Sequence, residues 1–289
     1  MSSIAKNNRG EGAVRKAFAS KGDDTTLSRF VKLTTSERQA KAAQRPAGKP
    51  GRKPSQLWLP DLRHKALENG VSIFHRKGVH SVDNLNHILV SGHNNVKIGR
   101  DVRKGKLFRD YWIYTVTLQE RATCPRSCHH WQDCYGNNMP WAKRADHNDR
   151  EKLQAAIERD IVRLLAVKGR AGILVRLHAL GDFFSVEYVE FWSDMLAKYP
   201  NLACYGYTAR GLGDPIGTAI SEIKTAYGRR FAVRWSDGGA PSDCTVSVHA
   251  GDARPKNAFM CPEQNGGTQA CATCGLCWQT DKNVAFVAH

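Results

Sequence analysis

Strand-like and helix-like segments alternate along the middle of the chain, and this alternation constrains the fold more than any other feature. Apolar strand patterns cover residues 111–118, 172–180, 202–210, 230–236 and 244–250. Helical periodicity covers residues 149–169, 185–200 and 214–228 between them. Such alternation predicts parallel βαβ units and an α/β fold. We favour a partial (β/α) barrel of parallel strands, because polar residues gather at strand ends, where barrel enzymes collect their sites.

The chain is predicted to have three parts. Residues 1–60 carry thirteen Lys or Arg against four acidic residues and predict a basic, partly disordered arm and linker, with short helices near 12–20 and 34–44. Residues 61–250 form the partial barrel, which begins with a hairpin of strands 86–91 and 96–99. Residues 251–289 form a Cys-rich, metal-binding knot.

A net charge of +16 indicates a polyanionic partner, nucleic acid or a nucleotide, because Lys and Arg displace counterions from phosphates. We see no secretory leader pattern and no apolar run of about 18 residues that spans a bilayer. We therefore expect a cytoplasmic protein without a membrane partner. Nine cysteines in such a chain favour metal binding or redox chemistry over disulfides.

Three cysteines follow the predicted strand 111–118 in the segment CPRSCHHWQDCYG, at Cys124, Cys128 and Cys134. Clustered thiolates at the end of a strand hold a metal or an iron–sulfur cluster. Three thiolates leave one iron of a 4Fe-4S cluster open, which is the arrangement that chelates S-adenosylmethionine. The alternative is a zinc site completed by His129 or His130.

Four more cysteines lie near the end of the chain, at Cys261, Cys271, Cys274 and Cys277. Two consecutive C-x-x-C steps and one earlier cysteine can wrap one zinc ion or hold the corners of an iron–sulfur cluster. The spacing predicts a bound metal and leaves both choices open.

Arginines lie in or directly after three successive predicted strands, at Arg176, Arg210 and Arg234. If these strands are parallel, the guanidinium groups converge on one anionic ligand. The alternative is that they form salt bridges that only close the mouth of the barrel, with Asp182, Asp214 and Asp237 as the respective partners.

The polar turn after the strand 172–180 is the second candidate feature. Strand alternation places Leu174, Arg176 and His178 on one face, and Gly181 allows a sharp turn and a close approach to a ligand. Ser185 is also placed to cap the following helix. The predicted catalytic residues are Arg176, His178, Asp182, Arg210 and Arg234. The predicted cofactor-binding residues are Gly181, Asp182, Ser185, Thr208 and Ser236.

Two resemblances follow from these motifs. The order of strand, CPRSCHHWQDCYG, helix, and a strand ending in a glycine-containing polar turn is similar to the radical S-adenosylmethionine core. The gap of five residues between Cys128 and Cys134 is longer than the two residues usual in that family. Together with RLHALGDFFSVEYVEFW and CATCGLCWQTDKNVAFVAH, the same motif resembles the uncharacterised "gene product 88" group of phages over about residues 80–289. This second resemblance implies metal sites and a phage or mobile-element origin.

The function predicted first is that of an iron–sulfur enzyme, radical S-adenosylmethionine-like, acting on a nucleotide or nucleic acid. The terminal cysteines then hold a second cluster or zinc. The alternative is a non-catalytic, zinc-stabilised nucleic-acid-binding protein, whose cysteines are structural and whose basic arm contacts phosphates. Polar strand ends favour the enzyme, because a purely structural barrel has little reason to bury Arg and His.

Overall fold

A computed structural model of the chain describes residues 59–237, 240, 242–248 and 255–287. The helices predicted at 12–20 and 34–44, and almost all of the basic arm, lie outside the described residues. Within the described part, no helix is long and apolar enough to cross a membrane.

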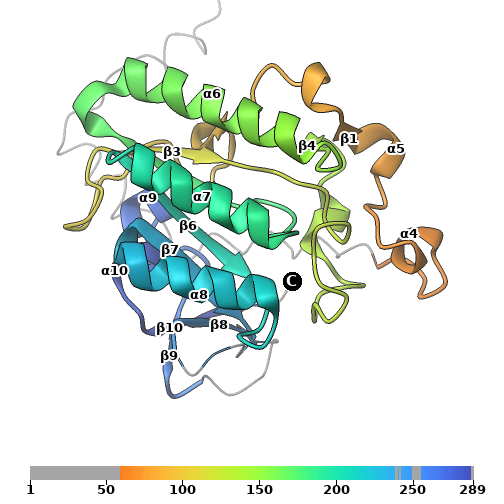
Figure 1. The fold of residues 1–289 in the computed structure, drawn as a ribbon. Coiled ribbons are helices and arrows are strands. Elements are labelled where there is room, and N and C mark those ends of the chain that lie inside the picture. Colours follow the sequence, from red (N-terminus) through yellow and green to blue (C-terminus); the bar gives the residue numbers. More distant parts are fainter. Residues whose placement is uncertain (1–58, 238–239, 241, 249–254, 288–289) are drawn as a thin grey trace, which may run out of the picture. The chain divides into compact units, whose positions relative to one another are not determined.

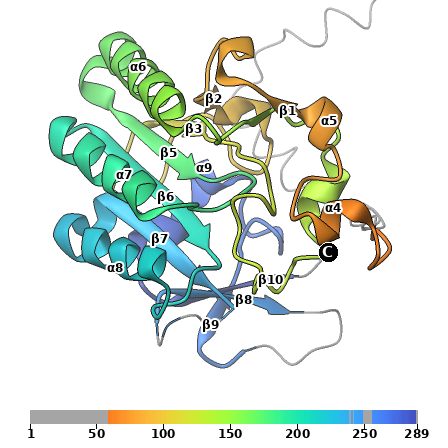
Figure 2. The same cartoon turned by 45° about the vertical axis from the view of Figure 1, so that its right-hand side comes forward.

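The centre of the fold is a mostly parallel sheet with the strand order β2-β3-β5-β6-β7-β8-β10-β9 (Figures 1 and 2). Every neighbouring pair is parallel except β2 and β3, which are antiparallel. In this order the strands are β2 (Val90–Ser91), β3 (Trp112–Thr115), β5 (Ile173–Leu177), β6 (Leu202–Thr208), β7 (Phe231–Ser236), β8 (Cys244–Val248), β10 (Asn283–Val287) and β9 (Ala258–Met260). The sheet is open, with β2 and β9 at its edges, so the α/β class and the parallel strands are confirmed and no closed barrel forms.

Three long helices connect the parallel strands and lie on one face of the sheet (Figures 1 and 2). They are α6 (Arg150–Lys168), α7 (Val186–Lys198) and α8 (Pro215–Tyr227). Each begins at a capping side chain, because the oxygens of Asp149, Ser185 and Asp214 accept hydrogen bonds from backbone N–H groups of the first turn. Their apolar faces pack on Val175, Cys204 and other buried side chains of this sheet face.

The opposite face of the sheet is covered by the C-terminal segment. Leu174, Ala203 and Tyr205 point to this face and pack against Trp278, which is fully buried. The covering helices are short, α9 (Cys271–Cys274) and α10 (Leu276–Gln279), and they are separated by Gly275, whose φ is +74°. The three long helices therefore lie on one side of the sheet, and α9 and α10, which connect β9 to β10, lie on the other side with the terminal cysteines.

The remaining helices and strands are short. A second sheet pairs β1 with β4 in parallel. The elements are α4 (Lys65–Glu68), α5 (His75–Gly78), β1 (Val79–His80), β4 (Arg144–Ala145) and the 3₁₀ helices η1 (Val82–Asn84), η2 (Gly92–Asn94), η3 (Tyr135–Asn138), η4 (Gly169–Ala171) and η5 (Gly228–Arg230).

Two parts of the sequence fold differently from the prediction. The hairpin of residues 86–91 and 96–99 does not form, because β2 pairs with β3 and the chain then turns into η2, where the Ser91 hydroxyl accepts from the His93 N–H at 3.3 Å. Residues Asn283–Val287 form β10, a strand that was not predicted, between β8 and β9. The Cys-rich segment is thus built into the main sheet.

Candidate functional site

The first cysteine group lies in the loop between β3 and α6, at the carboxyl end of β3. All three cysteines are half-buried, and each sulfur accepts a hydrogen bond from one backbone N–H. Arg121 donates to Cys124, His130 donates to Cys128, and Gly136 donates to Cys134. Burial is the main cause that raises the pKa of Cys134 to about 12. The free thiols are therefore neutral at pH 7, while the N–H donors favour the thiolate that a bound metal produces.

Arg121 places a buried cation beside this group. Its Nε donates to the Trp131 carbonyl at 2.8 Å and its Nη2 to the Asn137 side-chain oxygen at 2.7 Å. Its Nη1 is buried and has no partner among the described residues, and its charge favours the Cys134 thiolate. An unpaired buried donor is costly, so the position suits an anionic group held by the three sulfurs.

The turn after β5 packs directly on the cysteine loop. The backbone N–H of Asp182 donates to the Thr123 hydroxyl at 3.0 Å. Gly181 has a φ of +85°, and a Cβ atom there would lie 2.6 Å from the same hydroxyl. Arg210, which follows β6, donates to the carbonyls of Thr123 and Phe183, both at 3.1 Å. The ends of three successive strands therefore meet at the residue before Cys124.

Asp182 is a buried carboxyl held mostly by backbone N–H groups. One oxygen accepts from the Phe183 N–H at 2.7 Å and the other from the Ala209 N–H at 2.8 Å. The Thr208 hydroxyl also donates to it. Desolvation raises the pKa of Asp182 to about 6, against the hydrogen bonds and the charge of Arg210, which lower it. The carboxyl is thus poised to change its charge near neutral pH, next to the cysteine loop.

Arg176 lies on the sheet face that carries the C-terminal segment. Its Nη1 donates to the Leu177 carbonyl at 2.8 Å, and its guanidinium lies over the ring of Tyr207 at 4.2 Å. No carboxylate of the described residues pairs with it. Its charge acts on Cys271 of the terminal group, and it lies within electrostatic range of Tyr135, which adjoins Cys134. Arg176 is therefore a half-buried cation on the sheet face of the second cysteine group.

The other two arginines are engaged within the fold and do not converge with Arg176. Arg210 pairs with Asp214 at 3.3 Å, as the salt-bridge alternative predicts. Arg234 is fully buried and pairs with Asp243 at 2.9 Å, so the prediction that it pairs with Asp237 is wrong. Its remaining donors bind carbonyls of the C-terminal segment, those of Leu276, Cys277, Thr280 and Lys282. Arg234 thus anchors that segment to β7.

His178 does not share a face with Leu174 and Arg176. The strand β5 ends at Leu177, so the alternation of side chains stops one residue before the histidine. Its ring packs against Phe183 at 4.8 Å between centroids, and its Nε2 lies 3.2 Å from the Tyr188 hydroxyl. Burial lowers the pKa of His178 to about 3, so it is neutral in the helix-side core.

The three remaining candidate residues lie at strand or helix ends. Ser185 caps α7, since its hydroxyl accepts from the Tyr188 N–H at 3.2 Å, which confirms the capping prediction. Thr208 ends β6 and is buried against Asp182. Ser236 ends β7 and is half-buried.

The second cysteine group gathers on the face opposite the long helices. Cys261 follows β9, Cys271 and Cys274 lie on α9, and Cys277 lies on α10. The sulfurs are neighbours, since charges on Cys261 and Cys274 both raise the pKa of Cys277, after burial, which is the larger cause. The Tyr207 hydroxyl lies 3.0 Å from the Cys277 sulfur.

Neither group has the geometry of a single-ion site. Over the described ranges, no three Cys, His, Asp or Glu side chains converge as ligands of one metal ion. Each group consists of neighbouring thiols with buried hydrogen-bond donors beside them.

A cluster that the sequence did not reveal joins the cysteine loop to β8. His130 Nδ1 lies 3.2 Å from Asp133, and its Nε2 lies 3.0 Å from the Ser247 hydroxyl and 3.8 Å from Asp237. The sequence indicated His130 only as an alternative zinc ligand, and no local signal connects it with a serine 117 positions away.

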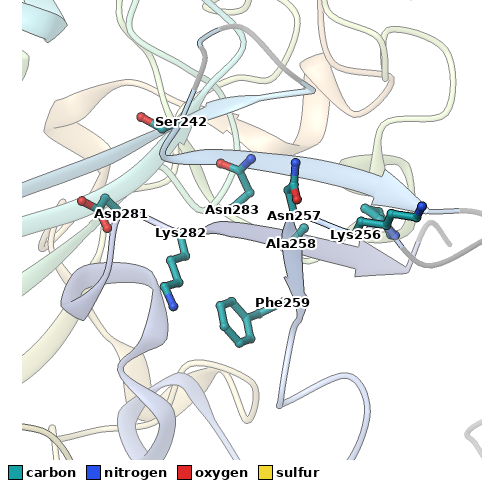
Figure 3. A pocket seen from close by; sticks show the side chains of 9 residues that line it. Ser242, Lys256, Asn257, Ala258, Phe259, Asp281, Lys282 and Asn283 are labelled. Carbon is teal, nitrogen blue, oxygen red and sulfur yellow. The ribbon is translucent and has the colours of Figure 1, made fainter.

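A separate groove of about 690 Å³ lies at the amino-terminal ends of β8, β9 and β10, and the candidate residues do not line it (Figure 3). Lys282 lies over the ring of Phe259 there, at 5.2 Å from its centroid. The groove is lined by Ser242, Pro255, Lys256, Asn257, Ala258, Phe259, Asp281, Lys282 and Asn283.

The fold and the site together define an α/β protein with two cysteine groups. The first lies in a loop at the carboxyl ends of the parallel strands, and the second lies on the sheet face opposite the long helices. Residues 88–211 match the family model described as Gene product 88. The match includes the first cysteine group and the turn at Gly181, ends before the terminal cysteines, and supports both the resemblance to that phage group and a phage origin. No curated protein and no solved structure matches the chain. The likeness to the radical S-adenosylmethionine core stays a prediction.

Proposed function

We propose that the chain is an iron–sulfur enzyme of the radical S-adenosylmethionine type, with Cys124, Cys128 and Cys134 as ligands of a 4Fe-4S cluster. The observation that carries the proposal is the junction at Thr123, where the ends of β3, β5 and β6 meet beside the cysteine loop. The strands β3, β5, β6, β7 and β8 follow one another in space as they do in the sequence, with α6, α7 and α8 on one face, and this order also supports a partial (β/α) barrel.

The residues around the three thiols fit such a group. Each sulfur accepts one backbone N–H, and Arg121 keeps a buried, unpartnered Nη1 beside Cys134. When bound, a cluster with three cysteine ligands supplies an open iron for the amino and carboxylate groups of S-adenosylmethionine and the electron that cleaves it. The donors of the protein stabilise the negative charge of the thiolates.

Asp182 and Arg176 are the residues that we assign to binding. Asp182 presents a carboxyl directly after Gly181 and suits the amine or a ribose hydroxyl of the cofactor, together with Thr208. Arg176 has no carboxylate partner among the described residues and suits an anionic substrate group. With the net charge of +16, we propose that this group is the phosphate of a nucleotide or a nucleic acid.

The test is metal analysis and an absorption spectrum of protein purified without oxygen. We expect brown protein whose iron falls by about four atoms per chain when Cys124, Cys128 or Cys134 is replaced by Ala. Cys204→Ala is the matched control, because Cys204 is buried in the helix-side core and belongs to neither group. Iron that does not depend on the three cysteines contradicts the proposal.

The second function is a non-catalytic, zinc-stabilised nucleic-acid-binding protein. It is supported by Arg210 and Arg234, which form ion pairs and contact carbonyls within the fold. Two of the three predicted catalytic arginines thus have structural partners, as expected of a non-catalytic protein. Colourless protein that contains zinc and no iron is the outcome that favours it.

A further inference from the structure

Three aromatic residues surround the second cysteine group with hydrogen-bond donors. Tyr205 and Tyr207 lie on β6, and Trp278 lies on α10. The rings of Tyr205 and Trp278 are in contact, with centroids 4.9 Å apart. All three side chains therefore belong to the face of the sheet that the terminal cysteines cover.

Two of these donors have no acceptor among the described residues. The Tyr205 hydroxyl and the Trp278 Nε1 are buried without a hydrogen-bond partner. Tyr205 is 1% exposed and Trp278 is 0% exposed, so solvent does not satisfy them. A buried donor without an acceptor costs roughly 1–3 kcal/mol, and buried polar groups in folded proteins almost always have partners. An acceptor is therefore expected at this place.

The thiols of Cys271 and Cys277 are the groups near this place that become negative when a metal binds. Charges on Cys271 and Cys277 act on the Tyr205 hydroxyl. The Tyr207 hydroxyl already lies 3.0 Å from the Cys277 sulfur. Because metal binding removes the thiol proton, Tyr207 becomes the donor in that contact. Arg176 adds a cation on the same side, since its charge acts on Cys271.

We propose that Cys261, Cys271, Cys274 and Cys277 hold an iron–sulfur cluster, not zinc, and that Tyr205, Tyr207 and Trp278 donate hydrogen bonds to its sulfur atoms. This inference extends the proposed function by choosing between the two metals at its second site. A zinc ion draws four sulfurs towards itself and adds no acceptor. A cluster adds sulfide ions, and these supply acceptor atoms for donors that no cysteine sulfur reaches.

The spacing of the ligands agrees with this choice. Cys271, Cys274 and Cys277 are separated by two residues each, which is the spacing of the first three ligands of bacterial four-iron ferredoxins. Gly275, in the left-handed conformation with φ of +74°, separates α9 from α10 and so places Cys277 on a new turn. Cys261 then supplies the fourth sulfur from the end of β9.

The first experiment measures iron, sulfide and zinc in full-length protein purified without oxygen, for two sets of variants. Replacing Cys124, Cys128 and Cys134 together by Ala is expected to leave about four iron atoms per chain. Replacing Cys271, Cys274 and Cys277 together is expected to remove those four. Zinc that depends on the terminal cysteines overturns the inference. The proposed function fails separately, if the first replacement removes no iron.

The second experiment tests the donors by variants that remove only a hydroxyl. Tyr205→Phe and Tyr207→Phe are expected to lower the reduction potential of the second cluster, because hydrogen bonds to sulfur stabilise the reduced state. They are also expected to speed the loss of its iron to a chelator about tenfold. Tyr199→Phe is the control, since its hydroxyl bonds to Glu158 of α6, on the face of the sheet opposite the second cysteine group. Unchanged potential and unchanged iron loss in both variants overturn the assignment of the donors.

Trp278 needs a control for packing, because it fills the core of this sheet face. Trp278→Phe is compared with Trp192→Phe, since Trp192 is also fully buried but packs in the helix-side core. A lower cluster potential for Trp278→Phe alone supports the donor role. An equal effect of both variants, or none, contradicts it.

Discussion

The backbone N–H of Asp182 donates to the hydroxyl of Thr123 at 3.0 Å, and this contact joins the turn after β5 to the cysteine loop after β3. The Thr123 hydroxyl also donates to the Gln119 carbonyl at 2.9 Å. The hydroxyl is thus satisfied in both directions within a buried position. The relative placement of Asp182 and Cys124 depends on it.

Removing that hydroxyl should loosen the site. Thr123→Val keeps the shape but leaves the buried Asp182 N–H unpaired, so we expect a loss of roughly 1–3 kcal/mol in the free energy of unfolding. Iron bound by the first cysteine group should fall as well. Thr123→Ser retains the hydroxyl and should stay within about 1 kcal/mol of the parent chain. Denaturant titration and iron analysis measure both; equal behaviour of the two variants is the contrary result.

Position 181 requires glycine for two reasons, its positive φ and the close approach of neighbouring atoms to the place where a Cβ would lie. Gly181→Ala places a Cβ 2.6 Å from the Thr123 hydroxyl, in a residue with φ of +85°. We expect it to cost about 2 kcal/mol or more, beyond the cost of positive φ alone. Gly169→Ala isolates that backbone cost, because Gly169 has a φ of +57° and no neighbour within 4 Å of the added Cβ. Thermal or chemical unfolding measures the stability of both variants. Equal losses of stability contradict the prediction, because they show that the short contact between the added Cβ and Thr123 does not destabilise the fold.

Arg234 should prove more important to stability than any surface arginine. Arg234→Met removes one of the two cations that pair with Asp243, the other being Lys224, and leaves the buried carbonyls that hold the C-terminal segment without their donor, so we expect a loss of about 3 kcal/mol. Arg229→Met is the neighbouring control; its contact with Asp281 is 3.7 Å long and exposed, which predicts less than about 1 kcal/mol. If chemical denaturation gives the two variants similar losses, Arg234 is not the anchor.

His178 should make the fold sensitive to acid. Its pKa is about 3 in the folded chain, mainly through burial, and near 6.5 when unfolded, so below pH 6.5 the unfolded chain takes up a proton that the folded chain does not. The contribution of His178 to stability is retained above pH 6.5 and falls by about 1.4 kcal/mol for each pH unit below it. Asp182, whose pKa is about 6, changes the stability of both chains alike in this range, so the test is the difference between the parent chain and His178→Phe. From about pH 6.5 down to pH 5 the parent should lose about 1.4 kcal/mol per pH unit relative to the variant. Parallel pH profiles of the two chains refute the assignment.

The sequence predicted the local elements well and the long-range partners poorly. The helices α6, α7 and α8 were found because their apolar periodicity and their capping residues are local signals. The prediction of a hairpin near Gly92 was wrong, because β2 forms by pairing with β3, a partner that is distant in the sequence. Short strands also carry little periodicity of their own.

The candidate site shows the same division. The loop of Cys124 and the turn at Gly181 come together, as expected where the carboxyl ends of neighbouring parallel strands meet. The true partner of Arg234, Asp243, and the contact of His130 with Ser247 depend on how β8 and the C-terminal segment lie in the sheet. No spacing along the chain encodes those contacts.

The measurement that tests the central claim most directly is the iron content of anaerobically purified protein, compared between the parent chain and Cys124→Ala. The account predicts about eight iron atoms per parent chain, from two four-iron clusters, and about four in the variant, with Cys204→Ala equal to the parent. Parent protein that carries zinc without iron, or iron that Cys124→Ala leaves unchanged, contradicts it.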